Sequence, residues 1–351
     1  MKKTNDISGK TRRFSRIIER YLYPCHSPSH GFQTVFHMRI TELLKKGKPI
    51  SLEISPPRNG EPVKELYEVL TRLTRTRKLP KVDYDSKLLP MRQPEFISVT
   101  YSSLGSARGG IVQLAANIGN KYNVDTIAHM TCGKKSRQQI ENQLMEMRYA
   151  GLENIIVVRG DKPKGARNFQ ANNEGHKYAY QMVQQIAEAN RGNFLNGKGT
   201  ATEFCIGVAA YPDKHPQCRS MKRSIEELKL KFDSGADFAV TQLFFDSERY
   251  LKLLDDAAYN GIKNPIIPGI LSLESWKQMK FLEEKLGVSV PDTLKEKVER
   301  YRDDSRAVGE IGIEHAVRTC EAIIKSAPGL HFYTLNKISP IDRVLDGLSV
   351  R

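Results

Sequence analysis

The sequence predicts one α/β domain folded as a (β/α)8 TIM barrel, with a basic extension in front of it. From residue 49 onward, eight short β-rich runs alternate with segments of helical periodicity, which is the pattern of repeated βα units on a parallel sheet. Eight such units close a barrel, whereas a doubly wound sheet usually has about six strands. We therefore assign residues 1–37 to an N-terminal extension and residues 38–351 to the barrel domain.

The expected strands are short apolar runs that end in polar or aromatic residues. In chain order they are residues 50–55, 96–101, 126–131, 155–158, 204–210, 238–241, 266–270 and 331–335. Amphipathic stretches predict helices at residues 62–77, 109–121, 136–150, 176–190, 219–234, 247–260 and 273–326. The last stretch is long enough for several helices.

Capping signals agree with these boundaries. Ser136 precedes a predicted helix and Gln139 follows three residues later, which is the pattern of a capping box. Gly151 stands where that helix should end. Residues 78–94 and 191–202 are rich in Lys, Pro, Asn and Gly, so we expect them to be surface insertions.

The positive charge is concentrated at the N-terminus. The formal net charge is +15, and residues 1–50 hold eleven Lys and Arg against three acidic residues. Such an arm is most often solvated, with a contact to RNA, a membrane or a partner as the alternative. Because the rest of the chain is only mildly basic, we expect no nucleic-acid partner. No run approaches the roughly 18 apolar residues of a membrane span and no signal-peptide core is present, so we expect a cytoplasmic protein without membrane contact.

Cysteine usage predicts reduced thiols. The five cysteines are widely spaced and odd in number, which does not fit a disulfide framework. Cys25 lies close to His26, His30 and His37, but these residues lack a regular zinc spacing. We therefore expect no metal site.

Candidate functional residues stand at the carboxyl ends of the predicted strands, where barrel enzymes carry their chemistry. These candidates are Glu53, Thr100, Tyr101, His129, Arg159, Asp161, Tyr211, Asp213, His215, Gln242, Asn336 and Lys337. No Gly-x-Gly-x-x-Gly motif opens a helix after any of the strands, and no Walker loop is present. Nucleotide binding of those two kinds is therefore not predicted.

Three of these candidates carry the clearest chemical signals. Glu53 is a carboxyl group within an apolar run, which suits a general acid, and a buried ion pair with Arg159 is the alternative. Gln242 lies beside aromatic residues, where its amide suits a flat heterocycle, unless backbone groups satisfy it in the core. His129 is either a satisfied core histidine or a site residue.

Eight blocks at these strand ends resemble the catalytic domain of the methylenetetrahydrofolate reductase family, in family order over about residues 49–348. They are LEISPPRNGEP (52–62), FISVTYSS (96–103), AHMTC (128–132), NIIVVRGDKPKG (154–165), VAAYPDKHP (208–216), GADFAVTQLFFD (235–246), IIPGIL (266–271) and HFYTLN (331–336). The resemblance implies an oxidoreductase of one-carbon metabolism and methionine biosynthesis. It would reduce 5,10-methylenetetrahydrofolate to 5-methyltetrahydrofolate through bound FAD, with NADH or NADPH as hydride donor.

The resemblance also implies roles for individual residues. The flavin contacts of the family correspond to Thr100, Tyr101, Ser103, His129, Arg159, Gly160, Asp161, Ala179, Tyr211, His215 and Lys231. Glu53 falls on the general acid that protonates the folate N10, and Asp161 falls on the carboxylate near flavin and pterin. Gln242 matches the amide that binds the pterin, and Lys337 stands where an arginine commonly meets the glutamate of the folate.

The chain also departs from the family pattern. The usual Glu-Phe-Phe-Pro-Pro is here Glu53-Ile54-Ser55-Pro56-Pro57, which removes two aromatic rings beside the proposed acid. Ser224 and Glu227 stand where contacts to the adenosine side of FAD are expected. Only the catalytic domain is matched, as in prokaryotic members, so we expect no feedback by adenosylmethionine.

Alternative functions stay open from the sequence. The chain could be the folate-side flavoprotein subunit of a redox complex, or a folate-binding barrel that transfers a methyl group without redox chemistry. A non-catalytic role through the basic arm is a third. We expect a homo-oligomer or an association with a redox partner subunit. The choice between NADH and NADPH stays open, because the acidic ribose-reading position of a Rossmann unit is absent.

Overall fold

The computed structural model of the chain describes residues 38–74, 94–101, 109–161, 169, 171–337 and 339–349. All eight predicted strand positions form strands within this part. The strands are β1 (Ile50–Ile54), β2 (Phe96–Val99), β3 (Asp125–Thr131), β4 (Asn154–Val158), β7 (Cys205–Ala210), β8 (Phe238–Thr241), β9 (Ile266–Ile267), β10 (Gly269–Ile270) and β11 (Leu330–Tyr333). The predicted extension at residues 1–37 lies outside the described residues.

The main sheet is parallel and returns on itself. Its strand order is β10-β11-β1-β2-β3-β4-β7-β8-β9. β9 pairs with β8 and β10 pairs with β11, and only Pro268 separates β9 from β10. Proline has no N–H to give to a ladder, which accounts for the break in the predicted strand 266–270. The two segments act as one strand that closes the predicted (β/α)8 barrel.

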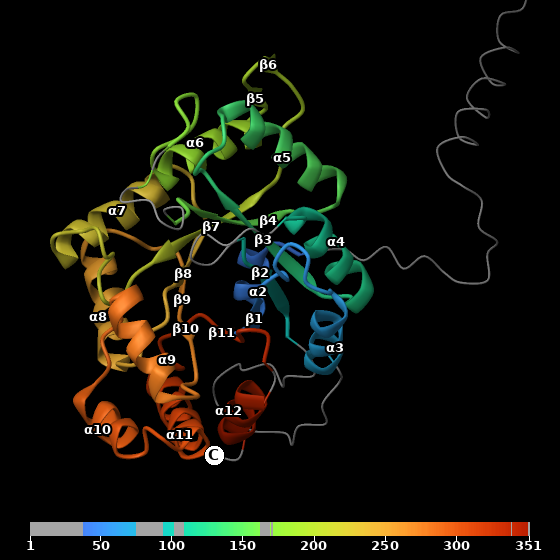
Figure 1. The fold of residues 1–351 in the computed structure, drawn as a ribbon. Helices are drawn as coiled ribbons and strands as arrows, with labels where there is room; N and C mark the ends of the chain where they lie inside the picture. Colours follow the sequence, from blue (N-terminus) through green and yellow to red (C-terminus); the bar gives the residue numbers. More distant parts are fainter. Residues whose placement is uncertain are drawn as a thin grey trace, which may run out of the picture. The chain divides into compact units, whose positions relative to one another are not determined.

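Helices lie outside the strands and alternate with them along the chain (Figure 1). They are α3 (Lys64–Leu73), α4 (Ile111–Tyr122), α5 (Arg137–Tyr149), α6 (Ala179–Asn190), α7 (Met221–Asp233), α8 (Ser247–Tyr259), α9 (Trp276–Phe281), the π-helical turn η2 (Leu282–Leu286), α10 (Asp292–Arg300), α11 (Ser305–Ile323) and α12 (Ser339–Ser349). The predicted capping box is confirmed, since Ser136 Oγ accepts from Gln139 N and Gln139 Oε1 accepts from Ser136 N. Among the described helices, none combines the length and apolar character that crossing a bilayer requires.

Three described elements were not predicted from the sequence. The insertion at 191–202 contains a short antiparallel hairpin of β5 (Asn193–Phe194) and β6 (Gly197–Lys198). After the last strand, α12 supplies the helix of the eighth βα unit. The third element, α2 (Ile40–Lys46), precedes β1.

Helix α2 closes the amino-terminal end of the barrel. Ile40 is fully buried in a cluster with Phe96, Ile127 and Ile156, residues of β2, β3 and β4. Ile40 N donates to Asn154 Oδ1 at 2.9 Å, and Asn154 is the first residue of β4. Burial of Ile40 and these hydrogen bonds hold the helix across the strand beginnings, so the opposite, carboxyl end of the barrel is left for the site.

Candidate functional site

A cavity of about 440 Å³ opens at the carboxyl ends of the strands. Ten predicted site residues line it, namely Glu53, Thr100, Tyr101, His129, Arg159, Gly160, Asp161, Tyr211, His215 and Gln242. These residues come from six different strand ends or the loops after them. These strand ends therefore meet at one cavity, and the functional roles of the residues stay predictions.

A second cavity, of about 540 Å³, lies between strands β4 and β7 and helices α6 and α7. It holds the two remaining described candidates for flavin contact, Ala179 and Lys231. Arg159, Tyr211 and His215 line both cavities, so the two spaces adjoin. Together they form an elongated site with one part over the barrel axis and another over its outer helices.

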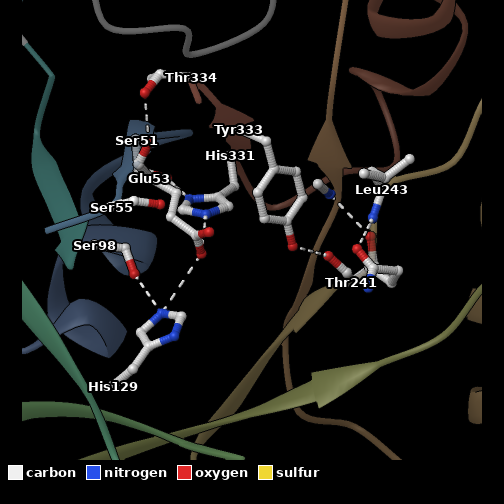
Figure 2. Close-up of polar contacts among 12 residues, drawn as sticks. Ser51, Glu53, Ser55, Ser98, His129, Thr241, Leu243, His331, Tyr333 and Thr334 are labelled. Atoms are coloured by element: carbon white, nitrogen blue, oxygen red, sulfur yellow. Dashed lines mark hydrogen bonds and ion pairs between the residues drawn. The ribbon is translucent and has the colours of Figure 1, made fainter. Parts of the chain in front are cut away.

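Glu53 faces two imidazole rings (Figure 2). Its Oε2 lies 3.6 Å from His129 Nε2 and 3.8 Å from His331 Nε2. A serine on the neighbouring strand anchors each ring. Ser98 Oγ is 2.7 Å from His129 Nε2, and Ser51 Oγ is 2.8 Å from His331 Nδ1. The parallel register explains the second anchor, because Ser51 of β1 pairs directly with His331 of β11.

Burial shifts the pKa values of the side chains around Glu53. Burial lowers the pKa of His129, and the nearby Glu53 carboxylate opposes that effect only in part. His129 is therefore a neutral imidazole near pH 7. Burial also raises the pKa of the Tyr333 hydroxyl well above its usual value, and that hydroxyl donates to Thr241 O at 2.7 Å. Within the part of the chain that the structure describes, His331 Nε2 is buried without a hydrogen-bond partner, which leaves an unsatisfied polar atom beside the carboxyl group.

Arg159 does not pair with Glu53, although the sequence left that ion pair open. Its guanidinium instead donates to Gln217 Oε1 at 2.6 Å and lies 4.6 Å from the centre of the Phe169 ring. The Arg159 Nε atom is buried and has no hydrogen-bond partner among the described residues. An anion in the second cavity could satisfy this atom.

Gln242 is held by the backbone on one side only. Its Oε1 accepts from Leu243 N at 3.0 Å, which fixes the amide plane at the edge of the cavity. The sequence left open an amide that backbone groups satisfy, and this holds for the amide oxygen only. The amide nitrogen faces no partner among the described residues and can donate to a ligand.

The second cavity is electropositive. Lys231 Nζ donates to Ala209 O at 2.7 Å, and no carboxylate of the described residues lies within ion-pair distance. Burial lowers the pKa of Lys231 to about 8 and, with help from Lys231, lowers the pKa of His215 to about 4. Glu227, the one acidic lining residue, is neutralised by Arg223 at 2.5 Å.

Two of the positions that depart from the family pattern lie in this second cavity. Ser224 and Glu227 both line it, and Ser224 Oγ accepts from His215 N at 3.1 Å. Ser224 therefore supports the loop that carries His215, a residue shared by the two cavities.

Three described candidates line neither cavity, namely Asp213, Asn336 and Lys337. Asp213 forms an ion pair with Arg249. Lys337 is exposed and its ammonium group forms an ion pair with Glu274. Its predicted contact with the substrate therefore stays a prediction. Ser103 lies outside the described residues, as do Cys25, His26, His30 and His37 of the cysteine and histidine segment.

Sequence reasoning missed the inner members of the site. His331 and Tyr333 sit within β11, and Ser51 sits within β1, whereas the prediction considered only strand ends. The signal was the alternation of strand residues, since Ser51 shares a face with Glu53 and His331 shares one with Tyr333. Leu335 and Phe281, which line the cavity mouth, carried no such signal.

Comparisons with known proteins point to one family. The family model described as Methylenetetrahydrofolate reductase matches residues 39–349. A probable methylenetetrahydrofolate reductase (NADPH) of Caenorhabditis elegans is 31% identical over 330 residues, which cover 92% of this chain and 45% of that protein. A 5,10-methylenetetrahydrofolate reductase of Pectobacterium carotovorum is 27% identical over 303 residues, which cover 86% of this chain and 90% of that protein.

The fold is also found among solved structures. An uncharacterized Clostridium thermocellum protein that binds two copies of 5-methyl-5,6,7,8-tetrahydrofolic acid superposes with a TM-score of 0.52 at 16% identity, covering 89% of this chain and 98% of that one. At that identity the likeness concerns the fold alone. The chain spans about half the length of the curated eukaryotic relatives it matches.

Proposed function

Because the chain belongs to the methylenetetrahydrofolate reductase family, we propose that it reduces 5,10-methylenetetrahydrofolate to 5-methyltetrahydrofolate, with NADH or NADPH as hydride donor and FAD as carrier. The observation that carries this proposal is the placement of Glu53. A carboxyl group stands at the barrel mouth between two imidazoles, beside the hydrogen-bonding amide of Gln242. This arrangement suits a reaction that needs one proton and a flat heterocyclic substrate.

The residues present fit a dinucleotide flavin. The adjoining cavities offer an elongated space, with apolar and aromatic walls over the barrel and cationic walls between α6 and α7. Lys231 and Arg159 supply positive charge at the second cavity, and the Arg159 Nε atom lacks a partner. A diphosphate would satisfy both groups, which is how buried cations are stabilised in proteins. Tyr178 and Tyr180 stack on each other at its wall, where a flat ring system could pack.

The protein residues would supply the proton and the orientation. When bound, the flavin supplies the hydride that the methylene carbon of the folate receives. Glu53 would donate a proton to the folate N10, so that the five-membered ring opens. Gln242 would hold the pterin by its amide nitrogen, and Asp161 would favour a positive charge on the substrate. His129 and His331 flank the Glu53 carboxyl group on two sides.

The test is a spectrum of the purified protein under anaerobic conditions. We expect a yellow protein that bleaches when NADH or NADPH is added and recovers its colour when methylenetetrahydrofolate follows. A yellow protein that neither nucleotide bleaches would support the folate-side subunit of a redox complex. A colourless protein that cannot take up added FAD would overturn the redox function and favour a methyl-transfer barrel.

A further inference from the structure

The chain turns sharply just after β11, at the mouth of the first cavity. Leu335 and Asn336 both adopt left-handed backbone conformations, with φ of 49° and 59°. Asn tolerates this region because its short side chain can hydrogen-bond locally, whereas Leu does not favour it. Two successive residues of this kind mark a turn that the surrounding structure holds in place.

The Asn336 side chain continues the sheet where the backbone has left it. Asn336 Oδ1 accepts from Ser55 N at 2.8 Å, and Asn336 Nδ2 donates to Ser55 O at 2.8 Å. A carboxamide has the same donor and acceptor as a peptide group, so Asn336 replaces one residue of a parallel strand. Ser55 lies one residue beyond the end of β1, where the strand would otherwise lack a partner on that side.

Thr334 completes the same connection one step earlier. Its Oγ1 donates to Glu53 O at 2.7 Å, and its backbone N–H donates to the same carbonyl at 3.3 Å. Asn336 N in turn donates to Thr334 Oγ1 at 3.0 Å. The backbone that follows the Glu53 side chain, from the Glu53 carbonyl to Ser55, is therefore tied to the turn after β11.

We propose that Asn336 is a positioning residue for Glu53, holding the end of β1 so that the carboxyl group faces the folate N10. This inference rests on the proposed function. Asn336 does not line either cavity, so it would act through Ser55 rather than by touching the substrate. Because misplacing a reacting group by about 1 Å can cost about 100-fold in rate, loosening this strand end would slow proton transfer without weakening substrate binding.

The chain contains a matched control at the other end of the barrel. Asn190 Oδ1 accepts from Phe204 N at 3.0 Å, and Asn190 Nδ2 donates to Phe204 O at 2.8 Å. The same pair of hydrogen bonds therefore holds the segment that leads into β7, far from the carboxyl ends of the strands. Asn190 Oδ1 also accepts from Thr202 Oγ1 at 2.6 Å. Its loss should affect folding stability alone.

Three variants separate the contributions. Asn336→Gly keeps the left-handed backbone accessible and removes both hydrogen bonds to Ser55. Asn336→Asp keeps the acceptor for Ser55 N but loses the donor to Ser55 O. Asn190→Ala removes the control hydrogen bonds. Each variant is measured for thermal stability, for the folate dissociation constant, and for the two half-reactions by stopped-flow absorbance.

We expect Asn336→Gly to slow the folate half-reaction about tenfold, with flavin reduction by the nicotinamide and the folate dissociation constant within about twofold of wild type. The rate of the folate half-reaction in Asn336→Asp should lie between those of Asn336→Gly and wild type. Asn190→Ala removes three hydrogen bonds, so it should lower thermal stability at least as much as Asn336→Gly and leave both half-reactions unchanged. This pattern separates positioning from general loosening.

Other results overturn the proposal. Wild-type rates in Asn336→Gly would show that Glu53 does not depend on the hydrogen bonds to Ser55, and equal slowing of both half-reactions would show a general structural role. If Asn336→Gly does not fold, Asn336→Asp decides alone, because a folate half-reaction at the wild-type rate in that variant contradicts the proposal. A wild-type protein that never oxidises with methylenetetrahydrofolate would instead overturn the proposed function itself.

Discussion

The carboxylates at the two ends of the barrel differ in how closely they contact their partners. At the amino-terminal end, carboxylates and amides accept from backbone N–H groups at short range, as Asp125 does from Met38 and Asp237 from Ile206, both at 2.7 Å. At the carboxyl end, Glu53 reaches its nearest imidazoles only at 3.6 and 3.8 Å. Folding alone favours the first arrangement. The looser polar group at the mouth is therefore best explained by a ligand that completes it.

The two ends of the barrel also differ in how tightly they are packed. Ile40 of α2 seals the amino-terminal end and is fully buried, while the carboxyl end is hollowed by cavities of about 440 and 540 Å³. Changes at the sealed end should therefore appear as losses of stability, and changes at the open end as losses of chemistry. The five predictions that follow test this division, from the largest expected effect to the smallest.

The largest effect is expected for Glu53→Gln at the open end. The amide keeps the shape of the side chain but cannot donate an acidic proton, so the folate half-reaction should slow about 10³-fold. Flavin reduction by NADH or NADPH should stay near the wild-type rate, because that step needs no proton from Glu53. Stopped-flow absorbance at the flavin band measures both steps. Equal losses in the two half-reactions would show that Glu53 supports the site generally and is not the acid.

At the sealed end, Ile40→Ala should cost stability and leave chemistry unchanged. The substitution opens a cavity inside the barrel beside Phe96 and Phe238, so the free energy of unfolding should fall by about 2 to 4 kcal/mol. Urea denaturation measures this change, and the half-reactions of the folded variant should match wild type. A variant of wild-type stability would show that α2 does not close the barrel in solution.

Local patterns predicted most of the framework. The β-rich runs located all eight strands, and Ser136 located a helix start, because these signals lie in neighbouring residues. Helix α2 was not predicted because its few apolar residues stand in a basic segment. Its N–H at Ile40 is also satisfied by Asn154, a residue 114 positions away. No local pattern carries such a contact.

The site residues also divide into those that a local sequence pattern predicts and those that only distant contacts bring together. Glu53 and His129 were predicted because they end or interrupt apolar strands, and the structure brings them together. His331 was missed because only the register of β1 with β11 places its ring beside Glu53. The ion pair of Lys337 with Glu274, 63 residues away, likewise has no sequence signal.

A smaller effect is expected at the second cavity from Lys231→Met. The substitution removes a buried cation from the proposed diphosphate site, so the affinity for FAD should fall about tenfold. Lys229→Met on the same helix is the control, since Lys229 pairs with Asp233 and does not line the cavity. Fluorescence titration of the apoprotein with FAD gives both dissociation constants. Equal affinities in the two variants would exclude Lys231 from the flavin site.

The same residue gives a pH dependence. Burial lowers the pKa of Lys231 to about 8, so the ammonium group is charged below pH 8 and loses its charge above it. Wild-type affinity for FAD should therefore weaken as the pH rises from 7 to 9. Lys231→Met should lack this part of the pH dependence, and a parallel curve for the two proteins would contradict it.

The smallest effect is expected from Glu95, at the sealed end just before β2. Burial raises the pKa of Glu95 to about 7, although its Oε2 accepts from Ile50 N at 2.7 Å. Because the folded-state pKa lies above the unfolded value, protonation of Glu95 stabilises the fold at low pH, and this contribution is lost as the pH rises through about 7. Glu95→Gln mimics the protonated form, so its advantage in unfolding free energy over wild type should grow by about 1 kcal/mol between pH 6 and pH 7. Urea denaturation at both pH values measures the difference, and the pH profiles of the half-reactions should not change. A variant that alters those profiles would show that the sealed end of the barrel reaches the chemistry at the open one.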